Sequence, residues 1–160
     1  MLIRPATRAD DGAIAPILLP VVRAGETYAL ERDLSERDAL AFWHAPGHSV
    51  FVAEVAGEVL GSYFLRANKR GGGSHVANCG YIVAGQATGR GIARAMAQHS
   101  FDRARAAGFR AMQFNFVIAT NRRAVALWLG LGFEQVGRLP GAFDHPALCE
   151  VDALVLYRRL

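Results

Sequence analysis

The sequence predicts a single domain, residues 1–160, of the α/β class with a mixed sheet (α+β), in the order β-α-α-β-β-β-α-β-α-β-β. Three observations support it. A chain of 160 residues that is 52% hydrophobic and 20% charged can bury one core. Its first half contains alternating strand patterns joined by tight turns, which predict antiparallel pairs. Its second half alternates strands with helical patterns, which predict one parallel pair with a right-handed crossover.

The first half is expected to contribute four strands and two helices. The expected strands cover residues 2–5, 49–55, 58–65 and 75–83. A first helix over about 10–20 has Asp10 and Asp11 as candidate N-caps, and Ser35 is the expected N-cap of a second helix that ends near residues 44–46. Ala56-Gly57 between two strand patterns predicts a hairpin. Residues 21–34 are expected to be irregular, and 71–74 to form a flexible turn.

The second half is expected to contain two helices and three strands. The longer helix runs from about Gly89 to Ala107 and ends at Gly108. Its apolar residues recur at spacings of three and four: Ile92, Ala93, Met96, Ala97, Phe101 and Ala104. The remaining elements are strands over 109–117, 133–139 and 151–158 and a helix over 121–131.

Composition excludes several classes of protein. The net charge is +4, but the basic residues, all arginine except Lys69, are spread along the chain, which favours local binding of an anionic cofactor over nucleic-acid binding. No apolar run reaches the roughly 18 residues that span a bilayer, and charges interrupt the N-terminus, so neither a membrane segment nor a signal peptide is expected. Cys79 and Cys149 lack metal-ligand spacing, and small, buried, reduced thiols are expected for both. These features predict a cytoplasmic protein.

The most informative segment is a glycine-rich turn between a strand and an amphipathic helix, Gln86-Ala-Thr-Gly89-Arg-Gly91. The first N–H groups of a helix have no internal partner and attract anions. Glycines let the backbone approach phosphate oxygens closely. The turn is not a P-loop, because no Gly-Lys-Ser/Thr is present, and Arg94 breaks the dinucleotide fingerprint. An ordinary turn before a core helix is the alternative.

This turn resembles the Gln/Arg-x-x-Gly-x-Gly/Ala signature of the GNAT acetyltransferases, which implies the GNAT acyl-CoA N-acyltransferase fold and acetyl-CoA as co-substrate, without a metal. A second segment, Asn121 to Phe133, resembles the family's Asn-x-x-Ala-x-x-Leu-Tyr-x-x-x-Gly-Phe motif, although Asn121 is also a plain N-cap candidate. The resemblance implies that these residues bind the cofactor: Ile82, Val83, Gln86, Ala87, Thr88, Gly89, Arg90, Gly91, Ile92, Asn121 and Trp128.

The chain departs from the family at two catalytic positions. Trp128 stands where many members carry a tyrosine that protonates the departing thiolate, and an indole is no proton source at neutral pH. Packing against the cofactor is its expected role, with hydrogen bonding to the sulfur as the alternative. The strand before the turn also lacks the glutamate that serves some members as general base.

Two strand asparagines are the remaining catalytic candidates. Alternation places Asn78 on one face of its strand, opposite Cys79 and Tyr81, and groups Asn115 with Gln113 opposite Met112, Phe114 and Phe116. Buried amides need partners, which substrate and water in a cleft would provide, or backbone groups where the two strands separate. In the expected mechanism, Asn78 or Asn115 holds a water that deprotonates the amine, and a backbone N–H near Ile82 stabilises the oxyanion.

A weaker resemblance links Asn78, Asn115, Asn121 and Trp128 to a GNAT subgroup that acetylates small amino and imino acids such as proline analogues. The expected substrate-binding residues are Glu26, Thr27, Tyr28, Asn78 and Asn115, although residues 26–31 could equally be a solvated loop. His75, His99 and His145 are weaker candidates for a base. Asp152 is expected either to face the cleft or to pair with an arginine. The family resemblance also suggests a homodimer. Two alternatives remain: an acyl-CoA-binding sensor without turnover, and acetylation of a protein amine.

Overall fold

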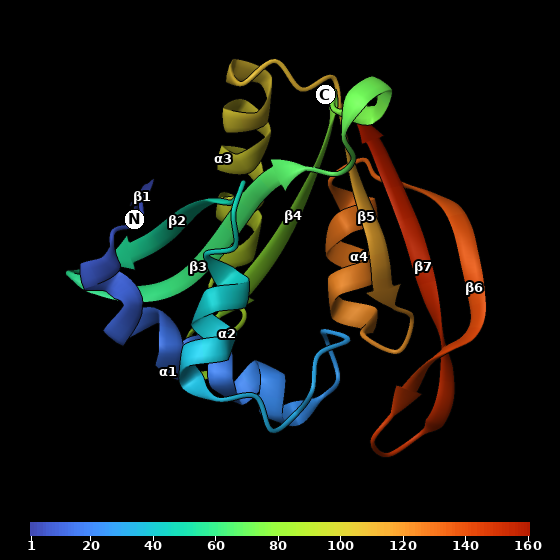
Figure 1. Ribbon diagram of the computed structural model, residues 1–160, viewed down its shortest axis with the longest axis horizontal. Helices are drawn as coiled ribbons and strands as arrows, with labels where there is room; N and C mark the ends of the chain where they lie inside the picture. The colour runs from blue at the N-terminus through green and yellow to red at the C-terminus, as the bar shows by residue number, and fades with distance from the viewer.

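The computed structural model describes residues 1–160 as a seven-stranded sheet with four α-helices (Figure 1), in the element order that the sequence predicts. The strands are β1 Leu2–Pro5, β2 Ser49–Val55, β3 Glu58–Ala67, β4 Val76–Val83, β5 Ala111–Ile118, β6 Glu134–His145 and β7 Cys149–Arg159. The helices are α1 Asp11–Ala24, α2 Glu36–Trp43, α3 Ile92–Ala106 and α4 Arg122–Gly130. The strand order across the sheet is β1-β2-β3-β4-β5-β7-β6.

The two faces of the sheet are covered by different helices. On β3, Ser62 accepts a hydrogen bond from the indole of Trp43 in α2, whereas its neighbour Tyr63 contacts His99 in α3. Successive strand residues point to opposite faces, so α2 and α3 lie on opposite sides of the sheet. Trp128 of α4 packs on Tyr81, whose hydroxyl meets Ser100 of α3, which places α4 on the α3 face.

The predicted hairpin at Ala56-Gly57 is confirmed. Both residues have positive φ angles, 52° and 83°, and Val55 pairs with Glu58 across the turn. This is the mirror-image turn that matches the twist of a two-stranded antiparallel pair. An alanine in this left-handed conformation is unfavourable by about 1 kcal/mol, a cost that the pairing of β2 with β3 offsets.

The predicted parallel pair is β4 and β5, and its two strands form a fork. They pair only at Val76 with Ala111 and at Ala77 with Met112, and then separate. Beyond this point the side-chain amide of Asn78 donates to the carbonyl of Gln113 over 2.9 Å and bridges the two strands. The fork therefore leaves an opening in the middle of the sheet, with backbone groups of both strands along its edges.

The structure corrects several predicted boundaries. A 3-10 turn, Arg8–Asp10, precedes α1, which extends to Ala24 rather than about residue 20 and ends at Gly25 with φ of 65°. Helix α3 starts at Ile92, because Gly89 and Gly91 have positive φ angles and stay outside the helix. Strands β6 and β7 form a longer hairpin than predicted, because β6 is an exposed edge strand with few buried side chains to mark it.

The core is a cluster of 30 buried residues between the sheet and its helices. Trp43, Tyr63 and Leu156 are among its fully buried side chains. Cys79 belongs to this core, but Cys149 is exposed at the start of β7, which corrects the expectation that both cysteines are buried. None of the four helices is both long and apolar enough to cross a membrane.

Candidate active site

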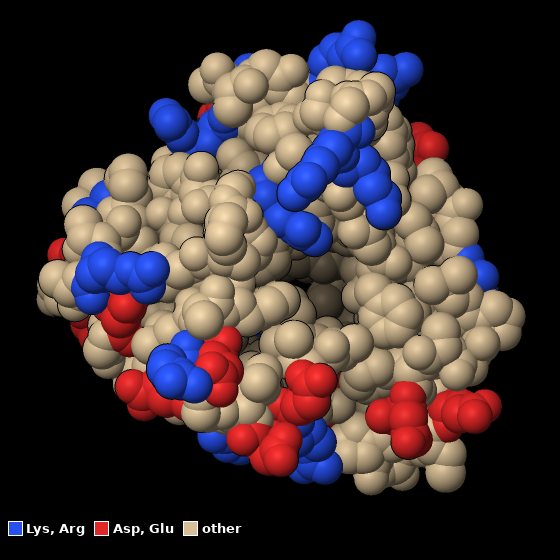
Figure 2. Space-filling model, in the orientation of Figure 1, with Lys and Arg blue, Asp and Glu red and all other residues tan.

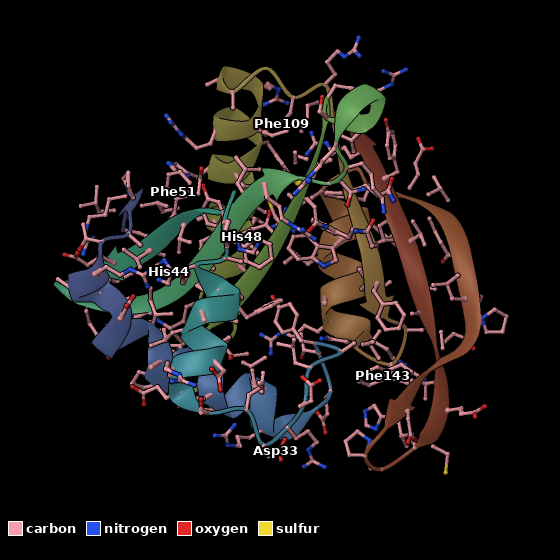
Figure 3. All side chains as sticks on the ribbon, viewed as in Figure 1. Asp33, His44, His48, Phe51, Phe109 and Phe143 are labelled. Carbon is pink, nitrogen blue, oxygen red and sulfur yellow. The ribbon has the colours of Figure 1, made fainter.

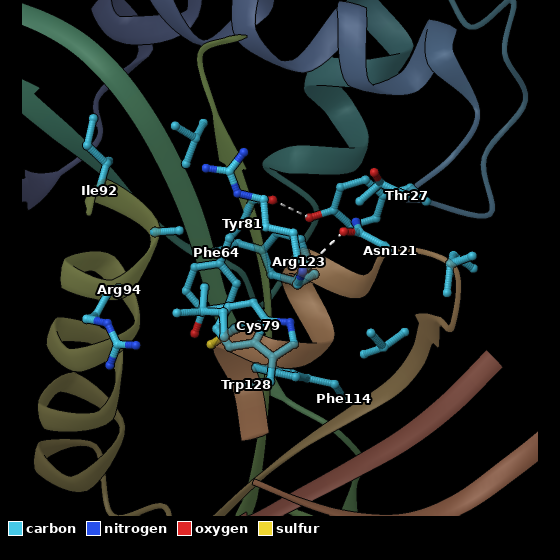
Figure 4. Close-up of a pocket in the computed structure, with 18 of the residues that line it drawn as sticks. Thr27, Phe64, Cys79, Tyr81, Ile92, Arg94, Phe114, Asn121, Arg123 and Trp128 are labelled. Atoms are coloured by element: carbon cyan, nitrogen blue, oxygen red, sulfur yellow. Dashed lines mark hydrogen bonds between the residues drawn. The ribbon is translucent and has the colours of Figure 1, made fainter. Parts of the chain in front are cut away.

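A cavity of about 690 Å³ passes through the fork between β4 and β5 (Figure 4). On the face of α3 and α4 its wall includes the turn before α3 and the first turn of α4. On the opposite face it reaches the segment between α1 and α2. The cavity thus joins the glycine-rich turn to the other side of the sheet, as a passage for an elongated ligand requires.

The turn before α3 presents a row of unbonded main-chain donors. A 3-10 turn, Gly85–Ala87, leads into Gly89 and Gly91, whose φ angles are 88° and 80°. The N–H groups of Gly89 and Gly91, and of the first three residues of α3, donate to no group of the chain. Together with the positive end of the α3 dipole, these donors are suited to bind an anion.

Two arginines outside the predicted set of site residues complete this end of the cavity. Arg94 lies in the first turn of α3 and Arg123 in the first turn of α4, and both line the cavity (Figure 4). The Arg123 guanidinium lies so close to Gly89 that a Cβ there would be 3.2 Å from it. Arg94 belongs to the polar stripe of the α3 pattern, and Arg123 follows Asn121 in the second motif. Neither pattern distinguishes an arginine of the cavity from an ordinary surface arginine.

Most of the predicted cofactor-binding residues line this cavity. Those that do are Val83, Ala87, Thr88, Gly89, Gly91, Ile92, Asn121 and Trp128. Gln86 and Arg90 are exposed and lie outside its lining, and Ile82 is buried in the core. The Asn121 side chain accepts a hydrogen bond from the Ala124 N–H and so caps α4, as its alternative interpretation predicts.

Trp128 forms one wall of the cavity within an aromatic cluster. Its ring lies 5.0 Å from that of Tyr81 and 4.8 Å from that of Phe114. The side chain is 8% exposed. Its indole Nε1 makes no hydrogen bond within the chain and is accessible from the cavity. Trp128 can therefore both pack against a ligand and donate a hydrogen bond to it.

The predicted alternation on β5 holds only in part. Phe114 packs on Trp128 and Phe133, but Phe116 contacts Phe143 of β6 instead of joining this cluster. The pairing of β5 with β7 is irregular between Phe114 and Val117. A bulge changes which face the following side chains occupy, and this explains the misplacement of Phe116.

On the opposite face, Tyr28 ties the segment between α1 and α2 to the fork. Its hydroxyl donates to the Tyr81 carbonyl over 2.9 Å (Figure 4). Burial raises the pKa of Tyr28 well above its usual value, so the phenol stays protonated at neutral pH. Thr27 and Tyr28 line the cavity, whereas Glu26 is exposed and does not. The predicted acceptor segment therefore reaches the cavity through two of its three proposed residues.

The two candidate asparagines belong to a chain of amides across the fork. Asn78 accepts from the Arg66 Nε over 3.3 Å and donates to the Gln113 carbonyl. Asn115 accepts from the Gln113 side chain over 2.8 Å and donates to Asn68 over 2.6 Å. Both asparagines line the cavity, and each makes one donated and one accepted hydrogen bond within the protein, including the bond to a backbone group expected if the strands separate. One lone pair of each carbonyl oxygen remains free.

No histidine or carboxylate side chain lines this cavity. His99 bonds to the Tyr63 hydroxyl on the α3 face, and His145 lines a second cavity of about 500 Å³ beside Tyr28 and Phe143. Phe143 is labelled near the β6–β7 hairpin in Figure 3. Asp152 pairs with Arg138, one of its two predicted environments. Burial raises the pKa of the Cys79 thiol to about 12. The cavity thus contains no side chain suited to accept a proton at neutral pH.

Comparison with known proteins places this geometry in a family. The acetyltransferase (GNAT) family profile matches residues 20–133. A GCN5-related N-acetyltransferase from Kribbella flavida is 43% identical, with a TM-score of 0.93 over 99% of this chain and 97% of that one. The N-acetyltransferase aca1 of Schizosaccharomyces pombe is 26% identical over 76% of this chain, and the match spans 66% of aca1, just under two thirds.

A further solved structure shares the fold and was determined with a ligand. It is yncA from Salmonella typhimurium, described as a putative acetyltransferase with its cofactor acetyl-CoA. The two chains are 24% identical, with a TM-score of 0.87 over 100% of this chain and 94% of that one.

Proposed function

Because this chain belongs to the acetyltransferase (GNAT) family, we propose that it transfers an acetyl group from acetyl-CoA to the amine of a small molecule. An amino acid or a close analogue is the favoured acceptor. The observation that carries the proposal is the row of unbonded N–H groups at Gly89, Gly91 and the start of α3, at one end of a cavity that crosses the sheet. These donors match the diphosphate of coenzyme A, with Arg94 and Arg123 beside them.

The open edge of β4 is suited to the rest of the cofactor and to the reacting carbonyl. The Ala84 N–H donates to the Leu60 carbonyl, and the Asn68 N–H donates to the Val76 carbonyl. The pairing of β3 with β4 between these two bonds has no irregularity. Even-numbered residues of β4 therefore form the hydrogen-bonded pairs with β3, and odd-numbered residues direct their N–H groups into the fork. Ile82 belongs to the even-numbered set, so its N–H points toward β3 and away from the cavity. The proposed oxyanion donor is therefore the N–H of Tyr81 or Val83.

The proposed reaction is direct attack by the neutral amine. The C–N bond forms as the C–S bond breaks, the electron pair leaves with the sulfur, and the proton lost from nitrogen passes to water. With no carboxylate or histidine in the lining, a water on the free lone pair of the Asn78 or Asn115 carbonyl is the proposed proton carrier. Trp128 Nε1 is the proposed hydrogen-bond donor to the leaving sulfur, and a thiol of pKa about 8.5 leaves without a strong acid.

Two other functions use the same cofactor site. A sensor that binds acyl-CoA without turnover is favoured by Trp128 at the tyrosine position and by the lack of a general base. Acetylation of a protein amine would need the acceptor face to admit a peptide. Release of free thiol from acetyl-CoA in the presence of amines distinguishes an enzyme from a sensor. A homodimer and a cytoplasmic location remain predictions from sequence.

The phosphate-binding turn is tested by the Gly89→Val substitution. A branched side chain at φ of 88° strains the turn by about 1–3 kcal/mol and would approach Arg123, so the donors must shift. We expect the Kd of acetyl-CoA, measured by calorimetry, to rise roughly 10- to 100-fold.

The control for this test is Gly72→Val, because a Cβ at Gly72 meets no atom within 4 Å and its φ is not positive. Thermal melting of both variants separates lost binding from lost folding. Unchanged affinity in folded Gly89→Val protein would overturn the assignment of the turn.

A further inference from the structure

Arg66, at the end of β3, is the charged side chain on the acceptor side of the cavity. It lines the cavity together with Phe64, its neighbour on the same strand face, and Asn78, its partner on β4. Phe64 packs on Phe42 of α2, so this is the face opposite α3 and the phosphate-binding turn. The cavity therefore has positive charge on both faces of the sheet, and the cofactor accounts for only one of them.

The distance along β4 separates Arg66 from the phosphate-binding turn. Arg66 pairs with Asn78, and the turn begins after Val83, five residues further along the strand. At about 3.3 Å per residue this corresponds to roughly 17 Å, in addition to the change of face. A guanidinium in this position does not contact the diphosphate, and its ligand must enter from the acceptor side.

Hydrogen bonding orients Arg66 and leaves its end free. Its Nε donates to the Asn78 carbonyl oxygen, and the amide of Asn78 is held in turn by the Gln113 carbonyl. Neither terminal nitrogen of Arg66 makes a hydrogen bond or an ion pair within the chain, although Arg4, Arg105 and Arg138 are paired with carboxylates. A planar pair of free donors facing a cavity fits a carboxylate in bidentate geometry.

We propose that Arg66 binds the carboxylate of the acceptor, so that the substrate is a free amino acid rather than a simple amine or a peptide amine. The inference rests on the proposed function and specifies its substrate class. Asn78 acts as a positioning residue through its hydrogen bond to the Arg66 Nε. Phe42, Phe64 and Tyr28 line the same side of the cavity and provide an apolar wall for the side chain of the amino acid.

The surface around the cavity agrees with this orientation. In Figure 2, a hollow opens at the centre of the face, with lysine and arginine side chains gathered along its upper border and most acidic side chains below it. Such a field draws the carboxylate of a dipolar molecule toward the upper border. The cavity lining contains no acidic side chain to compete with the carboxylate for Arg66.

The test compares acids with their matched amides. Thiol release from acetyl-CoA is measured with L-proline and L-methionine, with prolinamide and methioninamide, and with a peptide that begins with the same residue. For the better acid of the two, we expect kcat/KM to exceed that of its amide and of the peptide by roughly 10- to 100-fold, the range of one charge-assisted pair. In Arg66→Met this ratio should fall to within about threefold of unity, and Arg66→Lys should keep part of it.

Controls separate a specific role from a structural one. Arg70→Met removes an exposed arginine four residues away that does not line the cavity, and it should leave the acid-to-amide ratio unchanged. Asn78→Ala should raise the KM of the acid more than the KM of the amide, and because Asn78 is also a proposed holder of the water, kcat should fall for both substrates. Calorimetric titration of the CoA-saturated protein with the acids gives a readout of binding that does not need turnover.

The outcomes distinguish this inference from the proposed function. If acids and amides bind and react equally in the wild-type protein, or if Arg66→Met keeps the preference, the carboxylate site is overturned while the transferase assignment stands. Loss of acetyl-CoA binding to the wild-type protein would overturn the proposed function instead. If coenzyme A binds but none of the acids binds to the saturated protein, the inference fails, and the sensor becomes the better interpretation.

Discussion

At the scale of single residues, the proposed acceptor side of the cavity depends on a glycine in the middle of β4. The Phe64 ring lies directly over Gly80, where a Cβ would be 2.7 Å from the ring Cζ and 3.0 Å from the Tyr28 hydroxyl oxygen. No side chain fits under these two rings. Gly80 thus lets Phe64 line the proposed acceptor pocket and lets Tyr28 reach the Tyr81 carbonyl.

The Gly80→Ala substitution should therefore damage the acceptor side and spare the cofactor side. We expect unfolding free energy to fall by about 1–3 kcal/mol, because Phe64 must leave its position, and the acceptor KM to rise. Denaturant unfolding and acetyl-CoA calorimetry measure the two effects. Acetyl-CoA affinity should change less than threefold, and an equal loss on both sides would contradict the separation of the two ends.

At the scale of elements, an ion pair fixes the junction of β1 and α1. Arg4 donates to both Asp10 carboxylate oxygens, over 3.0 and 2.8 Å, and the Thr7 N–H donates to the same carboxylate over 2.7 Å. Asp10 is 8% exposed. The hydrogen bonds from Arg4, followed by those from Thr7, hold the pKa of Asp10 well below its ordinary value of 3.8.

This junction predicts a stability that depends on acid pH. Because the folded state binds the Asp10 proton less tightly than the unfolded state, the stabilisation is full above about pH 4 and is lost as the pH falls further. Asp10→Asn should lower the unfolding free energy by about 1–3 kcal/mol at pH 7. Urea unfolding from pH 7 to pH 2 should show the difference from wild type shrinking below pH 4, and a constant difference would contradict the ion pair.

At the scale of the whole molecule, positive charge favours an anionic ligand. The net charge is +4, and Arg94 and Arg123 line the cavity at the end proposed to hold the cofactor. These groups are partly in solvent, so salt screens them. The Kd of acetyl-CoA should rise roughly tenfold between 50 and 500 mM NaCl, measured by calorimetry. Arg94→Gln should flatten this dependence.

Arg37→Gln is the matched control for the salt experiment. Arg37 lies on α2 with a side chain that is 89% exposed, and it does not line the cavity. The variant carries the same net charge as Arg94→Gln. If both variants change the salt dependence equally, overall charge and not the arginine at α3 accounts for the attraction.

The order of elements, the hairpin and the glycine-rich turn were predictable, because each depends on residues close in sequence. Alternation, capping at Ser35 and Asn121, and the need for glycine at positions 89 and 91 are local properties. The predicted cofactor residues within that turn accordingly line the cavity for the most part. The exposed edge strand β6 gave only a weak local signal, and its extent was underestimated.

What the tertiary structure decided depends on pairing between distant residues. The direction of the Ile82 N–H follows from the register of β3 and β4, and a shift of one residue would reverse it. Tyr28 meets the Tyr81 carbonyl across 53 residues of sequence, and Arg66 in the cavity wall is bonded to Asn78 of the neighbouring strand. Local sequence sets backbone conformation, but only packing determines which side chains face the same cavity.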